Sequence, residues 1–436
     1  MTSRTRTRQG TERSVRAAVF DALAPRWFYG WTILAVAALA IFVSGPGQSH
    51  TFSVFVGPIG RELGISNASI ASAYGLATVA AAFLLPFIGR LVDRYGPRRM
   101  TLVVVLLLGV ACLAFAAATN VVWLTLGFAA LRFFGQGSLM LNSANLVSQW
   151  FSRRRGFALS LMALGFAASM AAHPPLGQYL ATTIGWRQAW VVLGVLTWAL
   201  MLPPVLLLVW DKPEDRGLAP DGAPVTPQEG SGPTSVSGLT RREALRTPAF
   251  YIVTAGWFAM AMLVTTLHFY QVTILKAQGV APEVAARVFP VSALAMVVTM
   301  PFVGRMFDGF RTRRVFALAL LVMVGSLVGV TLVHDVVTSV LYAIVFGINN
   351  AFSMTMFGYV WPRYFGRRHL GSIQGVGQMI GVVGASLGPL PVGVAFDVVG
   401  SATLTLRLLA LIPAGCMIAA AFLRTPAGVA VNERLE

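Results

Sequence analysis

The stretch PFIGRLVD at residues 86–93 decides the fold, because PFVGRMFD at residues 301–308 repeats it about half a chain later. In both copies a long apolar run ends in Gly-Arg, has an Asp four residues after the Gly and then breaks into arginines. Each copy therefore predicts a membrane helix that ends at a basic turn. The chain is a duplication, and its two halves should share one structure. The arginines of the turns are Arg94, Arg98 and Arg99 in the first copy and Arg311, Arg313 and Arg314 in the second.

The composition points to a lipid bilayer as the surroundings of this chain. Hydrophobic residues make up 56% of it and charged residues only 11%, whereas about a quarter of an ordinary soluble domain is charged. A net charge of +17 would suggest nucleic-acid binding in a soluble protein, but here the basic residues stand in short breaks between apolar runs. We therefore expect the bilayer, and no nucleic acid, as a partner. Cys112 and Cys416 lie inside apolar runs, which argues against a disulfide framework or a thiolate metal site.

Twelve apolar runs are long enough to cross roughly 30 Å of hydrocarbon, which takes about 20 helical residues. The sequence therefore predicts an all-α membrane protein with twelve transmembrane helices in two pseudo-symmetric six-helix bundles. The runs lie at residues 28–56, 68–92, 100–118, 122–149, 157–181 and 188–210 in the first half, and at 248–273, 284–308, 314–333, 337–363, 370–395 and 402–424 in the second.

The segments outside these runs divide the chain into domains. Residues 1–27 are polar and rich in arginine, so they predict a tail and no cleavable signal peptide. Residues 211–247 are rich in proline, glycine and serine and predict a flexible linker. The linker joins a bundle at residues 28–210 to a bundle at residues 248–424, and residues 425–436 form a second tail.

Arginine clusters occupy alternate breaks between the apolar runs, and the breaks on the opposite side are nearly uncharged. Cytoplasmic loops of membrane proteins carry the excess of Arg and Lys. We therefore place the arginine-rich breaks, the linker and both termini in the cytoplasm. The protein should be a multi-pass protein of the cell inner or plasma membrane.

Residues 89–99, GRLVDRYGPRR, resemble the G-x-L-x-D-R-x-G-R-R loop of the major facilitator superfamily. Residues 304–314 resemble it more weakly, because Gly309 replaces the usual Arg, and LRFFGQG at residues 131–137 is similar to the fourth-helix R-x-x-x-Q-G pattern of the superfamily. The resemblance covers essentially the whole chain. It implies a secondary transporter whose two bundles rock about a solute site near mid-membrane.

Within the superfamily the chain looks most like the bacterial relatives of the monocarboxylate and oxalate/formate carriers. This resemblance implies a small carboxylate as the solute. The residues that carry it are Gly30-Trp31, Trp150-Phe151, the stretch 153–158, Gly185-Trp186-Arg187, His268 and Gly279.

The repeated loop predicts a gate. Asp93 stands at a helix end followed by Arg94, where a carboxylate can accept hydrogen bonds from arginines and from a neighbouring helix N-terminus. Gly89 would permit close helix approach, as small residues do in membranes. We predict gating roles for these three residues and, in the second copy, for Gly304 and Asp308. The alternative is that the arginines only set the topology.

Arg132 is the strongest candidate for binding an anion. It lies about ten residues into the fourth helix, or roughly 15 Å, which places it near the midplane, where an ionisable residue marks a pathway by default. A guanidinium can hold a carboxylate with two parallel hydrogen bonds. The alternative is that Arg132 bonds to backbone carbonyls and fixes the packing of the first and fourth helices.

His50 and His268 occupy matching places in the first and seventh helices. Either histidine can take up the proton that drives symport, since an unperturbed imidazole titrates near neutral pH; alternatively, both are wetted residues at the outer mouth. His173, beside Pro174, is expected to be structural. Amide side chains that can hydrogen-bond a solute, or hold helices together, are Gln136, Asn142, Asn349 and Gln378.

The sequence contains no Gly-rich phosphate loop, His/Glu zinc motif or Ser nucleophile elbow, so we expect neither an enzyme nor a cofactor. We predict a monomeric secondary active transporter that moves a small organic solute, a monocarboxylate-like anion, by proton-coupled alternating access. The direction of transport stays open.

Three other functions remain open, because the resemblance implies a substrate arginine in the eighth helix where this chain has Met300. One is a carrier of a neutral or amphipathic metabolite or drug, favoured by the 11% of aromatic residues. Another is copper uptake, since Met296 and Met300 lie one helical turn apart and, with Met260, Met262 and His268, are side chains of the soft ligand types that copper prefers. The third is a membrane sensor that transports nothing.

Overall fold

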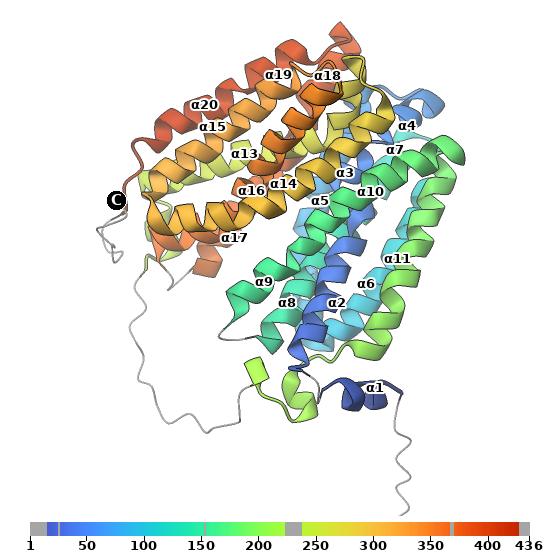
Figure 1. Cartoon of the computed structure of the whole chain (residues 1–436), viewed down its shortest axis with the longest axis vertical. Helices are drawn as coiled ribbons and strands as arrows, with labels where there is room; N and C mark the ends of the chain where they lie inside the picture. Colours follow the sequence, from blue (N-terminus) through green and yellow to red (C-terminus); the bar gives the residue numbers. More distant parts are fainter. Residues whose placement is uncertain (1–14, 25–26, 152–153, 223–237, 367–369, 427–436) are drawn as a thin grey trace, which may run out of the picture.

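The computed structural model describes residues 15–24, 27–151, 154–222, 238–366 and 370–426. The described residues are mainly helical and contain no β-strand. Eleven of their helices are long and apolar enough to cross a membrane. Figure 1 shows these helices gathered into two groups that follow the two halves of the sequence. The predicted all-α membrane fold of two six-helix bundles is confirmed.

The helices of the first half agree with the predicted runs to within a few residues, apart from the first run. Between them, α8 continues α7 through a π-helical segment, η2, and α10 continues α9. The bounds are α2 Gly30–Val43, α5 Asn67–Tyr95, α6 Pro97–Ala116, α7 Val121–Leu131, η2 Arg132–Leu139, α8 Met140–Trp150, α9 Arg155–Met162, α10 Leu164–Thr183 and α11 Trp186–Leu208.

The helices of the second half also follow the prediction. Two of the six spans are broken, by Gly388 between α17 and α18 and by Ala410 between α19 and α20. The bounds are α13 Pro248–Ala277, α14 Pro282–Gly309, α15 Thr312–Val330, α16 Val336–Phe365, α17 Leu370–Leu387, α18 Pro389–Val399, α19 Thr403–Leu409 and α20 Leu411–Ala420.

The first predicted run, 28–56, is not one continuous helix. After α2 the chain turns through the 3-10 segment η1, Gly45–Gly47, into the short helices α3, Ser49–Phe52, and α4, Val56–Leu63. The sequence Gly-Pro-Gly explains the break, because proline has no N–H for the helix ladder and glycine adopts many backbone conformations. Glycine also fits the space: a Cβ on Gly47 would lie 2.4 Å from the carbonyl oxygen of Leu131.

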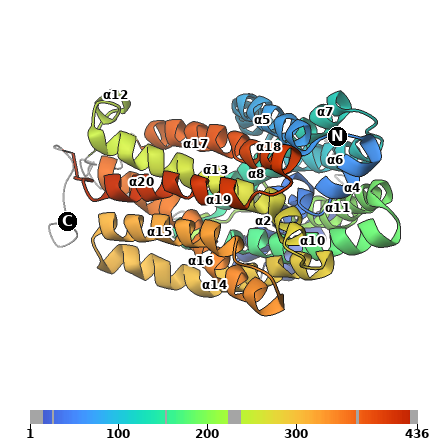
Figure 2. The ribbon, with the colours of Figure 1, turned by 90° about the horizontal axis from the view of Figure 1, so that it is seen from above.

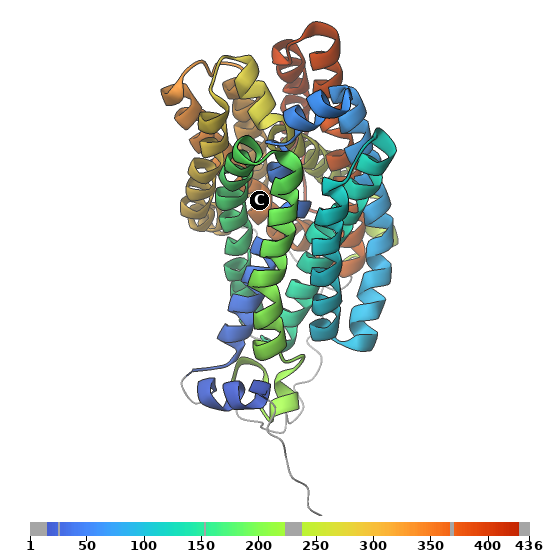
Figure 3. The same cartoon turned by 90° about the vertical axis from the view of Figure 1, so that its right-hand side faces the viewer.

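Parts of the predicted tail and linker are folded. Residues Val15–Leu23 form helix α1, which lies below the first bundle in Figure 3. Phe20 packs against the rings of Tyr29 and Trp210, and Arg216 forms a 2.7 Å ion pair with Asp21. The linker region contributes the short helices η3 Pro213–Arg216, η4 Pro220–Gly222 and α12 Arg241–Ala244, and its residues 223–237 lie outside the described part.

The two halves meet at one end of the molecule. We call the end at which residues 211–247 join the halves the linker end, and the opposite end, which contains Gly64, Ile184, Gly279 and Gly400, the far end. The contacts between the halves join α10 to α14, and α5 to α17 and α18. In Figure 1 the two groups of helices converge at the far end and diverge toward the linker end, and in Figure 2 they lie side by side.

Glycine permits one of the closest contacts between the halves. A Cβ on Gly75 of α5 would lie 2.6 Å from the carbonyl oxygen of Ser386 of α17. Small residues allow such backbone approach between membrane helices.

Replacing Gly47 should weaken the fold at the break of the first helix. Gly47→Ala places a methyl group against the backbone of Leu131, and overpacking of this kind costs about 1–3 kcal/mol. We expect a lower melting temperature of the purified protein in detergent. Gly57→Ala is the matched control, since no described heavy atom lies within 4 Å of the Cβ it would add. Equal melting temperatures for the two variants would contradict the close approach.

Candidate functional site

Arg132 lies where the broken first helix meets the fourth. Its side chain is buried, and it begins the π-helical segment η2, a distortion that is frequent at functional sites. The Nε atom donates to Thr78 Oγ1 at 3.2 Å, and Nη1 donates to the carbonyl oxygen of Gly47 at 3.3 Å. The guanidinium carbon is 4.9 Å from the ring centre of Tyr74. These contacts, all within the first half, match the packing role that the sequence left as the alternative.

His50 and His268 face each other across the two halves. Their ring centres are 6.0 Å apart, and the side chains are only 1% and 4% exposed. Phe166 and Phe289 pack against both rings. The structure thus brings together the two histidines that the sequence matched, and it buries them instead of leaving them at a wet mouth.

His50 also forms a hydrogen-bonded contact with the fifth span. Its Nε2 lies 3.3 Å from Ser169 Oγ, which is 3.1 Å from His173 Nδ1. His173 also contacts the break of the first helix, because a Cβ on Gly45 would lie 2.4 Å from its ring. By contrast, His268 Nε2 is buried without a hydrogen-bond partner among the described residues. His173 is therefore part of the polar chain that begins at His50, which the sequence did not indicate.

The four amide candidates lie in different surroundings. Asn142 of α8 and Asn349 of α16 are fully buried, and neither amide atom of either residue has a partner in the described part of the protein. Buried polar groups are normally hydrogen-bonded, so these two amides suit contacts with a solute or water. Gln136 is half-buried in η2, and Gln378 is exposed on α17.

The predicted gate residues lie at the linker end, where the halves diverge. No described heavy atom lies within 4 Å of a Cβ built on Gly89, and Gly304 has only Tyr359 Oη at 3.9 Å. The described residues therefore show no close approach at Gly89 in this conformation, and its gating role stays a prediction. Arg94 is exposed and lies over the ring of Tyr95. The side chains of Asp93 and Asp308 fall outside those described.

An interaction that sequence reasoning missed closes the far end. Asp397 of α18 accepts hydrogen bonds from the backbone N–H groups of Asn67 and Ala68, at 3.0 and 2.7 Å, and from Asn67 Nδ2 at 3.1 Å. A carboxylate at a helix N-terminus satisfies free N–H groups and complements the helix dipole. Here the acid and the helix belong to different halves, so the cap latches them together. A lone Asp in a nearly uncharged break was the only sequence signal.

Two further contacts surround this latch. Tyr270 Oη donates to the carbonyl oxygen of Asn67 at 2.8 Å, and the N–H of Val272 donates to Ser53 Oγ at 3.0 Å. Deeper between the halves, Phe269 of the second half packs against aromatic rings of the first. These rings belong to Phe52, Tyr74 and Phe128.

The methionines proposed as soft metal ligands serve the apolar packing. Met260, Met262 and Met296 are buried in the hydrophobic core, and Met300 packs against it. Among the described residues no group of three or more His, Cys, Asp or Glu side chains is arranged to hold a metal ion.

Residues 37–389 match the sequence model of the Major Facilitator Superfamily. The chain belongs to the Major Facilitator Superfamily. This finding confirms the resemblance carried by residues 89–99 and 131–137, and it makes the protein a membrane transporter by family. As a family member the chain is expected to handle a small-molecule solute.

Relatives of this superfamily member include carriers of carboxylates. The 4-hydroxybenzoate transporter PcaK of Pseudomonas putida is 24% identical over 317 residues, which cover 66% of this chain and 69% of the relative. Monocarboxylate transporter 13 of Rattus norvegicus is 25% identical over 415 residues, or 93% of this chain and 89% of the relative. A bacterial homologue of the lysosomal transporter Spinster, in its inward-facing and occupied conformation, shares the fold with a TM-score of 0.64 at 16% identity, covering 91% of this chain and 94% of that chain.

The far-end latch gives a conformational prediction for this superfamily member. Asp397→Ala removes the cap and should shift the population toward conformations with the far ends apart by roughly twofold to fivefold, since a carboxylate at an exposed helix N-terminus contributes about 0.3–1 kcal/mol. Spin labels at Thr119→Cys and Leu332→Cys, both at the far end, report the separation by electron–electron distance measurement. The background carries Cys112→Ala and Cys416→Ala, which remove the two native thiols.

Asp335→Ala is the control for this experiment. Asp335 is also an acid of the far end, but it caps its own helix, with the Thr338 N–H at 2.7 Å. A distance distribution that changes equally in both variants would show that Asp397 does not latch the halves.

Proposed function

We propose that this superfamily member is a secondary active transporter that moves a small organic anion, a monocarboxylate, across the cell inner membrane by proton-coupled alternating access. The observation that carries the proposal is the pair of buried histidines between the two halves, His50 and His268. Arg132 is buried in the first half, beside the break of the first helix. The carboxylate carriers among its relatives support the same solute class. The protein would act as a monomer.

The environment of Arg132 favours an anion as the solute. Among the described residues, its guanidinium donates hydrogen bonds to neutral groups, including the Thr78 hydroxyl and the Gly47 carbonyl. Within the described residues it has no ion pair, because the salt bridges there join other residues. An uncompensated charge inside a membrane protein is costly. A carboxylate bound beside the guanidinium would supply the missing negative charge. Arg132 would then act as the substrate arginine that the resemblance implies in the eighth helix, where this chain has Met300.

The histidine pair supplies a physical route to proton coupling. Like charges close together in a buried site disfavour one another, so two protonated imidazoles at 6.0 Å would repel and push the halves apart. Proton uptake would therefore accompany opening of the far end, and proton loss would accompany its closure.

The arginine-rich breaks orient the carrier in the membrane. Clusters such as Arg94, Arg98 and Arg99 lie at the linker end, which the positive-inside rule places in the cytoplasm. Both termini would lie on that side. The closed far end would then face outward, and the described conformation would be the inward-facing one.

A neutral or amphipathic solute is the second candidate. The aromatic rings of Phe52, Tyr74, Phe128 and Phe269 between the halves favour it, because aromatic side chains bind apolar surfaces well. Comparing the uptake of 4-hydroxybenzoate with that of its neutral amide separates the two candidates.

Arg132→Gln should abolish most carboxylate uptake. Removing a cation that holds a carboxylate with charge-assisted hydrogen bonds costs about 1.5–3 kcal/mol, so we expect uptake of labelled 4-hydroxybenzoate and lactate into proteoliposomes to fall at least about tenfold. Arg407→Gln, at an exposed position, is the control. Wild-type uptake by Arg132→Gln would refute the carboxylate assignment.

Replacing either interface histidine, as in His268→Gln or His50→Gln, should uncouple solute transport from the proton gradient. Each variant would lose accumulation of the solute against its gradient when a pH gradient is imposed, but it would keep exchange of internal for external solute. His334→Gln is the control, because His334 is exposed in a far-end loop beside Asp335. Full pH-driven accumulation by both interface variants would exclude the histidine pair as the proton site.

A further inference from the structure

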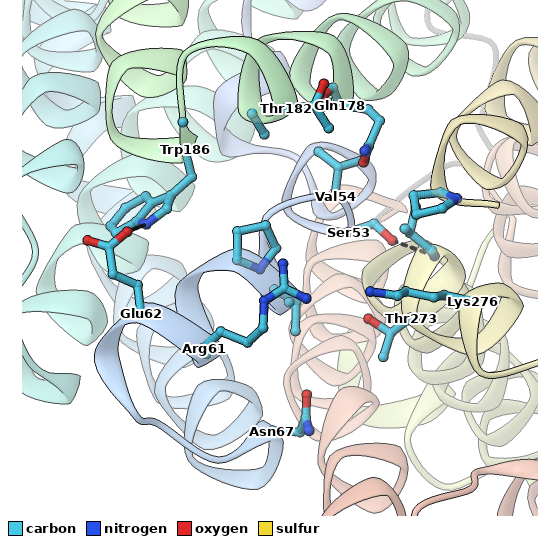
Figure 4. A pocket seen from close by; sticks show the side chains of 18 of the residues that line it. Ser53, Val54, Arg61, Glu62, Asn67, Gln178, Thr182, Trp186, Thr273 and Lys276 are labelled. Atoms are coloured by element: carbon cyan, nitrogen blue, oxygen red, sulfur yellow. Dashed lines mark hydrogen bonds between the residues drawn. The ribbon is translucent and has the colours of Figure 1, made fainter.

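A pocket of about 840 Å³ lies at the far end, directly over the closed latch. Residues of both halves line it, as Figure 4 shows. Its lining includes Ser53, whose hydroxyl accepts the hydrogen bond from Val272, and Asn67, which Asp397 caps. The floor of the pocket is therefore the same set of contacts that holds the two halves together.

Two cations from opposite halves face each other across this pocket. Arg61 belongs to α4 of the first half, and Lys276 belongs to the end of α13 in the second. Figure 4 shows their charged ends directed toward one another. Both side chains are exposed, and neither forms an ion pair in the described part of the chain. Like charges repel, so this arrangement favours an anion between them.

The acids around the pocket compensate these cations only in part. Both carboxylate oxygens of Glu62 are engaged, one with Arg187 Nε at 2.7 Å and the other with the indole N–H of Trp186. The hydrogen bond from Arg187 also lowers the pKa of Glu62, which keeps this acid ionised and paired. Glu283, at the start of α14, is then the remaining acid of the lining. Two cations, Arg61 and Lys276, then face one acid, Glu283, so the pocket keeps one net positive charge.

Neutral donors complete a site of the size and polarity that a small carboxylate needs. The lining residues that can donate are Gln178 and Thr273, in addition to Ser53 and Asn67. The hydroxyl of Thr182 also lines the pocket, but it donates to the backbone carbonyls of Gln178 and Tyr179. Ligand pockets of proteins have volumes of about 300–1,000 Å³ and a few convergent polar groups. A carboxylate held by both cations would make two charge-assisted hydrogen bonds, which are stronger than neutral ones.

We propose that a carboxylate-bearing organic anion binds on the outer face between Arg61 and Lys276, and that it does so only while the far end is closed. The solute class rests on the proposed function, but the site is separate from the one at Arg132. Each half supplies one of the two cations, so opening the far end separates them and dismantles the site.

A ligand shifts a conformational equilibrium by its differential affinity for the two states. The bound anion therefore stabilises the closed far end, and a high concentration of the anion outside slows reopening. In its absence the repulsion between Arg61 and Lys276 favours opening. The pocket thus couples the outer concentration of the anion to the state of the gate.

The test is a titration with benzoate of the labelled protein in nanodiscs, with labels at Thr119→Cys and Leu332→Cys in the background without native cysteines. Benzoate should raise the population with close far ends. Lys276→Gln and Arg61→Gln should each need about tenfold more benzoate for the same shift, because each loses one charged partner. Arg287→Gln, which removes an exposed far-end charge outside the pocket lining, should titrate like the parent.

Benzamide, the neutral analogue of benzoate, should produce no shift in any variant. The inference is overturned if benzoate leaves the parent distances unchanged, or if both pocket variants titrate like the parent. Failure of the transport proposal gives a different result, namely no carboxylate uptake into proteoliposomes while the charge-dependent shift persists. If uptake is normal but the benzoate-induced change in label distance is the same in the Arg61 and Lys276 variants as in the parent, this site is rejected and the transport proposal is not.

Discussion

A lipid bilayer offers no water to the backbone of a broken helix, and this constraint organises the centre of the protein. The Gly-Pro-Gly turn interrupts the first span and frees the carbonyl of Gly47, to which the buried guanidinium of Arg132 donates. The same break aims His50 at the second half, where it meets His268. One charged side chain thus holds a distorted helix in place and brings the ionisable groups of the interface together.

The two ends of the molecule are held in different ways. At the far end a carboxylate of one half caps a helix of the other, and glycine at position 75 lets the backbones touch. At the linker end the repeated loop carries the superfamily motif, but no atom of the described residues lies near the position of a Cβ on Gly89. The alternating access that we propose would require such asymmetry, since the contacts that close one end must be absent from the other. In that cycle the far-end contacts would have to break when the outer side opens.

The sequence predicted most of the fold and part of the site. Apart from the first run, 28–56, which the Gly-Pro-Gly turn breaks, the apolar runs predicted the spans to within a few residues, because the bilayer imposes a minimum length on every helix. The duplication matched His50 with His268, and the structure brings them together. The cap formed by Asp397 was not predictable, because it joins residues that are 330 positions apart in the chain and no local pattern relates an acid at one helix end to the start of another helix.

The sequence by itself determined the solvent, the number of spans, the duplication and the family, since each depends on local composition or on a contiguous motif. Only the tertiary structure decided which end is closed, what Arg132 contacts, and that Arg61 and Lys276 face one pocket. Those facts depend on how the two halves, each predictable from its own sequence, pack against each other. The packing of the two halves is set by a few contacts between residues that are far apart in the chain, and such contacts have no local sequence pattern that predicts them.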